Sequence, residues 1–173
     1  KQQSIEDYFN QIRDQVVVMS GNLMVEEALQ DFSRAYKQYS FQQQELLAES
    51  EVRDAVLAYY RDGFAAEYGE QNGSVYSDPR SLAASLGDNG LALQHRFIAD
   101  NPNPLGSKHL LAESGQGTDY DAAHSRYHGF FTSYLQKFGY YDIFLIDADS
   151  GNSVYSFFKD LDRSEERRVG KEG

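Results

Sequence analysis

Two histidines four residues apart are the clearest arrangement in this sequence for which chemistry can be proposed. The segment HSRYH places His124 and His128 on adjacent turns of one helical face, a spacing that two metal ligands can use. The glutamate that follows the first histidine in helical zinc-protease motifs is missing, because Ser125 stands there. A third ligand would have to come from a distant segment, and His109 is the one that we consider. A metal site, and with it a small metal-dependent enzyme, stays an alternative; polar contacts or capping by the two histidines is the interpretation we prefer.

Arg126 and Tyr127 lie between these histidines and suggest a different chemistry. A guanidinium is a planar fork of donors that matches a carboxylate, and a tyrosine adds a hydroxyl and a ring face. Two roles remain open for Arg126, a clamp for a small ligand or a surface ion pair with Asp119 or Asp121.

Asp142 is the third residue of interest, because it stands among aromatic residues in YYDIFLID. An unpaired carboxylate is costly to bury, so Asp142 must either be paired or face water. It could hold the amine of a ligand, or it could pair with Lys159 across a hairpin. Asp147 and Asp149, next to Gly151, are expected to form the turn.

Other catalytic motifs find little support. The chain has no cysteine and no Gly-x-Ser-x-Gly elbow, and the Gly-Ser-Lys of residues 106–108 lacks the upstream glycine of a phosphate-binding loop. Carboxylate pairs such as Glu26 and Glu27 fall on the exposed face of a predicted helix. We therefore expect no enzyme and no cofactor.

The composition limits the classes of partner. With 173 residues, of which 40% are apolar and 14% aromatic, the chain is long enough for one folded domain. Its net charge of −11 argues against nucleic acid and against docking on an anionic membrane surface. No apolar run of about 18 residues could span a bilayer. The sequence opens KQQSIEDYF without an initiator methionine or signal peptide, so we expect a fragment of a longer protein.

Residues 1–69 are expected to be mostly helical. Apolar residues recur at intervals of four and three along one helix, a heptad seam formed by Ile5, Phe9, Ile12, Val16, Met19 and Leu23. The SGN of residues 20–22 interrupts it, and a second helical pattern runs through Val25, Ala28, Phe32, Tyr36 and Tyr39. A third follows over 46–69, with Gly69 as its stop. The seam could pair with a second copy of the helix or pack on the domain's own sheet.

Residues 70–137 are expected to mix helix and loop, and residues 138–162 to form a hairpin. The first segment contains a weak strand at Ser74–Ser77, a short helix around Leu91–Ile98, a stiff NPNPLG loop and a helix from about residue 120 that ends at Gly139. Two aromatic, β-branched runs then flank Asp-Ser-Gly-Asn, a strong hairpin signal. A lone hairpin is marginal in water, so this one must pack on the helices or join further strands.

Together, the long first helix and the segments NPNPLGSK, YDAAHSRYH and FGYYDIFLIDADSGNSVYSFFKDLD resemble the extracytoplasmic sensor regions of bacterial methyl-accepting chemotaxis proteins and related transmembrane signal transducers. These regions are similar to Cache domains, and the resemblance covers about residues 1–162. It implies an α+β fold, with long N-terminal helices packed on a PAS/Cache-like antiparallel sheet that is truncated at its C-terminal strands. It also implies a periplasmic location, a membrane-anchored parent protein and a homodimer formed through the first helix.

The resemblance further implies a pocket that binds a small carboxylate, amine or amino acid. The residues of this chain that we place in it are Arg126, Tyr127, His128, Tyr140, Asp142 and Lys159. The Arg-x-Trp-Tyr element of amino-acid-binding members is not complete, because the chain has no tryptophan. A helical scaffold that binds a partner helix without a small ligand is the main alternative.

After Asp162 the sequence departs from this family. The last eleven residues, RSEERRVGKEG, carry four of the sixteen basic residues and resemble the translated read-through of a sequencing adapter. We expect residues 163–173 to be a foreign or disordered tail; a native charged tail is the alternative.

Overall fold

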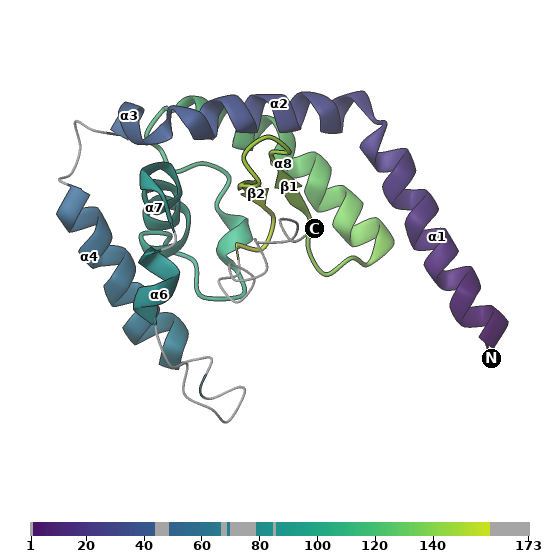
Figure 1. Ribbon diagram of the computed structural model, residues 1–173, viewed down its shortest axis with the longest axis horizontal. Helices are drawn as coiled ribbons and strands as arrows, with labels where there is room; N and C mark the ends of the chain where they lie inside the picture. Colours follow the sequence, from purple (N-terminus) through teal and green to yellow (C-terminus); the bar gives the residue numbers. More distant parts are fainter. Residues whose placement is uncertain (1, 44–48, 67–68, 70–78, 85, 160–173) are drawn as a thin grey trace.

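The computed structural model describes residues 2–43, 49–66, 69, 79–84 and 86–159. Within this part of the chain the protein is mostly helical and has one small antiparallel sheet of two strands, which makes it an α+β fold (Figure 1). The predicted strand at Ser74–Ser77 and the tail of residues 163–173 lie outside the described residues.

Two helices at the N-terminus meet at a sharp turn, as the SGN interruption predicts. Helix α1 (Gln2–Ser20) ends before Gly21, and the Asn22 side chain accepts a 2.9 Å bond from the Met24 amide to cap α2 (Leu23–Lys37). Figure 1 shows α1 leaving the body at an angle to α2.

Most of the heptad seam on α1 is exposed, and only its end, at Met19, packs against the main core. Ile5 is 57% exposed and Phe9 is 64% exposed, so a packing of this part of the seam against the domain's own sheet is wrong. Val17 and Val18, on another side of the helix, are exposed as well.

Helix α2 packs against the long helix α8 (Asp119–Phe138) to form the main core. Its apolar stripe is buried as predicted, with Phe32 fully enclosed by aromatic rings that include Tyr120 and Tyr155. A capping box between Thr118 and Asp121 starts α8, and Gly139, with φ 69°, ends it in the left-handed conformation that glycine adopts without strain. The end at Gly139 is as predicted, whereas the capping box at Thr118 was not predicted.

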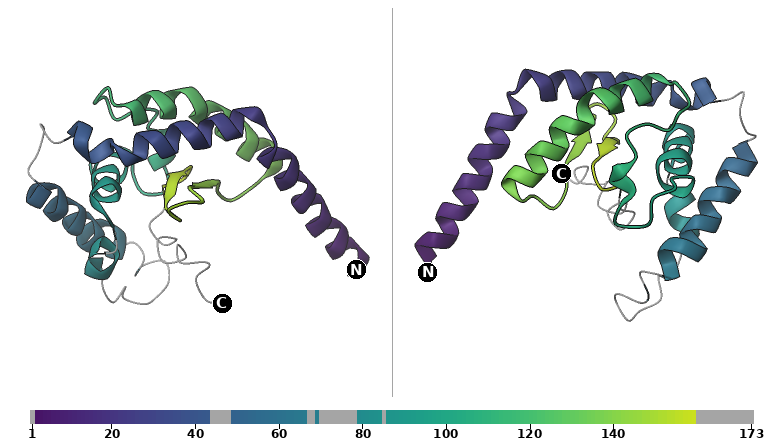
Figure 2. Two further views of the ribbon diagram at one scale, coloured as in Figure 1. Left: turned by 45° about the horizontal axis from the view of Figure 1, so that its top comes forward. Right: turned by 180° about the vertical axis from the view of Figure 1, so that it is seen from behind.

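A smaller helical layer covers the other side of the hairpin (Figure 2). It contains α3 (Tyr39–Gln43), α4 (Glu49–Tyr59), the π-helical turn η1 (Tyr60–Phe64), α6 (Pro79–Ala84), α7 (Asp88–Gln94) and the π-helical turn η2 (His95–Ala99). Val56, Tyr60 and Leu91 form its separate apolar core. The helix expected around Leu91–Ile98 is confirmed and starts three residues earlier; the residues that follow Gly69 are not described.

The hairpin consists of β1 (Phe144–Ile146) and β2 (Ser153–Ser156), shorter than the two predicted runs. A register shift between Leu145 and Ile146 interrupts the ladder. Asp147 accepts a 3.0 Å bond from the Asp149 amide in the turn, which confirms its turn-forming role. The loop before α8 contains the short 3-10 helix η3 (Lys108–Leu110), in which the His109 ring stacks on Phe157, the residue after β2.

Candidate functional site

Arg126 and Tyr127 attach α8 to α2 and do not face a ligand cavity with the other predicted residues. The Arg126 guanidinium lies 3.2 Å from the Glu27 carboxylate and 3.6 Å from that of Asp31. The Tyr127 hydroxyl donates a 2.7 Å bond to Asp31, and burial, reinforced by that carboxylate, raises the pKa of Tyr127 to about 12. Their positions fit a structural tie between two helices.

The predicted ion pair of Arg126 with Asp119 or Asp121 is wrong. Asp121 turns back into the helix cap, where it accepts bonds from Thr118 and Ser114, and Asp119 is bonded to Gln42. Arg126 pairs with Glu27 and Asp31 of α2 instead.

His128 sits at the junction of α8, η3 and the hairpin, with both ring nitrogens bonded. Its Nε2 lies 2.7 Å from the His109 carbonyl, which can only accept, so Nε2 carries the proton. Nδ1 then accepts from the Tyr155 hydroxyl at 2.8 Å. Burial, and next the charge of Lys159, lowers the pKa of His128 to about 4, so the neutral ring is the stable form at pH 7.

His124 stacks on His128, with ring centroids 4.4 Å apart, so the predicted shared face is confirmed. Its Nδ1 donates to the Ala112 carbonyl at 2.5 Å, and its buried Nε2 has no hydrogen-bond partner among the described residues. Burial and the charge of Lys159 hold the pKa of His124 well below its usual value. No group of three His, Cys, Asp or Glu residues suited to a metal ion occurs in the described part of the chain.

Lys159 is buried three residues after the end of β2, with only 6% of its surface exposed. Its φ of 62° is left-handed, which is unusual for a residue with a side chain. Its Nζ donates a 3.2 Å bond to the Phe157 carbonyl and lies about 6 Å from the ring centres of Phe97 and Tyr155. Burial lowers the pKa of Lys159 to about 7, against a smaller opposing effect of Asp142.

The predicted direct pair between Asp142 and Lys159 is wrong. Asp142 instead closes the base of the hairpin, where Oδ1 accepts 3.2 Å bonds from the amides of Phe157 and Phe158 and Oδ2 accepts from the Ser156 hydroxyl. These bonds continue the strand pairing beyond the short ladder. Burial raises the pKa of Asp142, and the backbone amides oppose this shift.

A cavity of about 400 Å³ opens beside this cluster, between α8, η3 and the end of the hairpin. We call it the outer cavity; its walls include His109, His128, Gln136, Tyr140, Phe157 and Phe158. It therefore brings together two of the six predicted site residues. A smaller cavity of about 60 Å³, which we call the inner cavity, lies beside Lys159. Tyr155 lines the inner cavity, and its hydroxyl bonds to His128, which lines the outer cavity.

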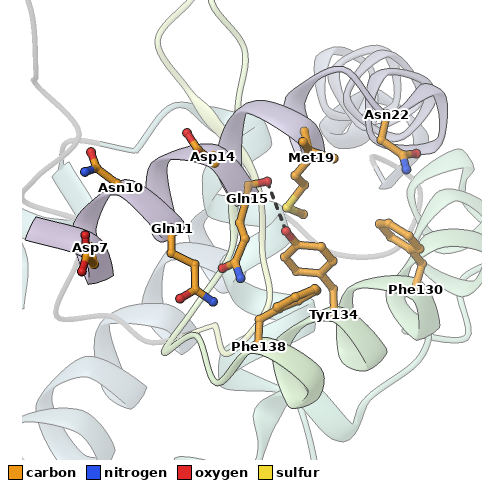
Figure 3. A pocket seen from close by; sticks show the side chains of 11 residues that line it. Asp7, Asn10, Gln11, Asp14, Gln15, Met19, Asn22, Phe130, Tyr134 and Phe138 are labelled. Carbon is orange, nitrogen blue, oxygen red and sulfur yellow. Dashed lines mark hydrogen bonds between the residues drawn. The ribbon is translucent and has the colours of Figure 1, made fainter. Parts of the chain in front are cut away.

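Tyr140 connects the outer cavity with α1. Its hydroxyl donates a 2.5 Å bond to Oε1 of Gln15, and its ring is stacked on Tyr134 at 6.0 Å. Tyr134 in turn donates a 3.3 Å bond to the Gln15 backbone carbonyl, as Figure 3 shows. Beyond Tyr134 lies a groove of about 560 Å³ between α1 and α8, with Phe130 and Phe138 along its α8 wall (Figure 3).

Sequence reasoning missed Gln15, Gln94 and Tyr155, the residues that complete these spaces. Tyr155 stood in a predicted strand, but nothing in the sequence showed that its hydroxyl meets an imidazole on α8.

No family model, curated protein or solved structure matches this chain. Among the described helices, none is both long and apolar enough to cross a membrane.

Proposed function

We propose that this chain is the ligand-binding sensor region of a bacterial transmembrane receptor of the chemotaxis type. A small carboxylate, amine or amino acid would bind in the outer cavity, and α1 would carry the signal. One observation carries this proposal: Tyr140 is at once a wall of the cavity and a hydrogen-bond donor to α1. The PAS/Cache-like character of the sheet and its truncation belong to the same proposal.

The cavity walls suit a ligand with an apolar part and a polar end. Phe157 and Phe158 supply ring faces, while Thr132 and Gln136 supply groups that donate or accept hydrogen bonds. A ligand that displaces Tyr140 or rotates its ring would break or strengthen the hydrogen bond to Gln15. The position of α1 relative to α8 would then change. Such coupling requires different affinities for the two positions of α1, on the order of 1–3 kcal/mol.

The exposed apolar side chains of α1 support a homodimer through this helix. Ile5, Phe9 and Val16 follow the heptad interval and remain more than half exposed. In the receptor this helix would continue toward the membrane, and the domain would lie on the periplasmic side. The same side chains favour the second candidate, a helical scaffold whose α1 binds a partner helix without any small ligand.

A thermal-shift screen separates the two candidates. The purified chain would be tested against small carboxylates, amino acids, amines and divalent metals, because a ligand at about a hundred times its dissociation constant adds about 2.7 kcal/mol. For the sensor we expect an organic ligand to raise the melting temperature and to change hydrogen exchange in α1. In Tyr140→Phe the melting shift should remain while the change in α1 is lost.

The control is Thr132→Val, which alters the cavity wall but leaves the bond between Tyr140 and Gln15 in place. A ligand whose shift persists after Lys159 of the inner cavity is replaced by Met, and which leaves α1 unchanged in the wild-type protein, would remove the proposed relay. A cooperative melt with no shift from any compound, in a chain that dimerises through α1, would favour the scaffold.

A further inference from the structure

The inner cavity beside Lys159 has the properties of a second, separate binding site. Its walls come from α2, α7, η2, α8 and the second half of the hairpin, so it is formed by segments far apart in the chain. One bound water needs a cavity volume of about 10–15 Å³. A volume of about 60 Å³ therefore holds a molecule of about five non-hydrogen atoms. It does not depend on the sensor function or on the outer cavity.

Two buried polar groups in this wall lack the partners that burial requires. The Lys159 ammonium has three N–H donors, and the described residues provide a single acceptor, the Phe157 carbonyl. Gln94, at the end of α7, is only 9% exposed, and its Oε1 is buried without a hydrogen-bond donor among the described residues. Buried polar atoms of this kind are normally satisfied, and a bound molecule would satisfy both.

One small molecule that binds both groups must contain a hydrogen-bond acceptor for Lys159 and a hydrogen-bond donor for Gln94. Lys159 needs a hydrogen-bond acceptor, and its positive charge favours an anion. Asp142 is the described carboxylate that acts on the pKa of Lys159, but it is already bonded to backbone amides. Gln94 needs a donor. A carboxylate and a hydroxyl on neighbouring carbons provide both within about five non-hydrogen atoms.

We propose that the inner cavity binds a short 2-hydroxycarboxylate, such as glycolate or lactate, with its carboxylate on Lys159 and its hydroxyl donating to Gln94. The rings of Phe97 and Tyr155 enclose the carbon atoms. A 2-amino acid of the same size fits the space less well, because its ammonium would stand beside the Lys159 cation and lose its hydration.

Isothermal titration of the whole chain with four matched compounds tests this site. Glycolate should bind; acetate, which lacks the hydroxyl, should bind at least about tenfold more weakly, since a buried acceptor left unpaired costs about that factor or more. Glycine should bind more weakly than glycolate because its ammonium is repelled by the Lys159 cation. Ethylene glycol should not bind because it lacks the carboxylate. Equal binding of glycolate and acetate would overturn the role of Gln94, and glycine binding as tightly as glycolate would overturn the ligand class.

Two variants and one control locate the site. Lys159→Met replaces a buried cation with an apolar chain of similar length, so the protein should melt no lower while glycolate binding is lost. Gln94→Leu should reduce the preference for glycolate over acetate to near one. Lys137→Met, at an exposed position of α8, should change neither.

The pH dependence gives a further readout. Lys159 must be protonated to hold the anion, so affinity should fall about tenfold from pH 6 to pH 8, through its pKa of about 7. His109, His124 and His128 lie in the same field, and burial, followed by the charge of Lys159, lowers the pKa of each, to about 4 for His128. Glycolate binding that survives in Lys159→Met, or no binding of glycolate or lactate at millimolar concentration to the wild-type protein, would overturn the proposal.

Discussion

Mild acid should destabilise this protein through His128, which is buried in its neutral form. Its two ring nitrogens are bonded to the Tyr155 hydroxyl and the His109 carbonyl, and a proton on Nδ1 would force that hydroxyl to turn away. Burial, followed by the charge of Lys159, lowers the pKa of His128 to about 4, against about 6.5 in an unfolded chain. The unfolded state therefore binds more protons between these two values, and stability rises with pH across this window.

The size of the effect follows from the two pKa values. Between pH 7 and pH 5 the linkage relation gives about 1.8 kcal/mol for one enclosed imidazole, so a loss of about 1–2 kcal/mol is expected. His124, whose pKa is lowered by burial as well, acts in the same direction.

Urea unfolding at pH 7 and pH 5, on the wild-type protein and on His128→Gln, measures this contribution. Glutamine does not titrate, so the variant should lose about 1–2 kcal/mol less than the wild type on acidification, whatever its stability at pH 7. An NMR titration of the imidazole in the intact protein provides an independent check, with a midpoint well below 6 expected. Equal losses in the two proteins would refute the view that the fold holds His128 neutral.

Four further substitutions test the fold and its connections. Tyr140→Phe removes the donor to Gln15 and should cost about 1 kcal/mol and speed hydrogen exchange in α1; unchanged exchange there would show that the bond does not hold the helix. Asp142→Asn weakens the charged acceptor at the hairpin base and should cost about 1.5–3 kcal/mol by thermal denaturation, unless other groups close the hairpin. Gly139→Ala forces a side chain into a left-handed position, and urea unfolding should show a loss of about 1 kcal/mol; no loss would mean that the α8 terminus relaxes. Phe32→Ala should cost about 3–5 kcal/mol in the same assay, and a loss below about 1 kcal/mol would argue against its central place in the core.

Local signals in the sequence carried most of the secondary structure. The apolar stripe of α2, the cap at Gly139 and the turn after Ile146 depend on near neighbours in the chain, so periodicity and turn chemistry predicted them. The strands came out short because Asp142 replaces part of the ladder with side-chain bonds, a substitution that no periodic pattern reveals.

The candidate site was only partly predictable for the same reason. The sequence determined that His124 and His128 share a helical face, because that follows from helical geometry alone. Only the tertiary structure decided that His128 meets Tyr155, 27 residues later, and that Tyr140 reaches Gln15, 125 residues earlier. Such contacts are set by how whole helices pack against the hairpin, and the direction of each side chain follows from that packing rather than from its neighbours in sequence.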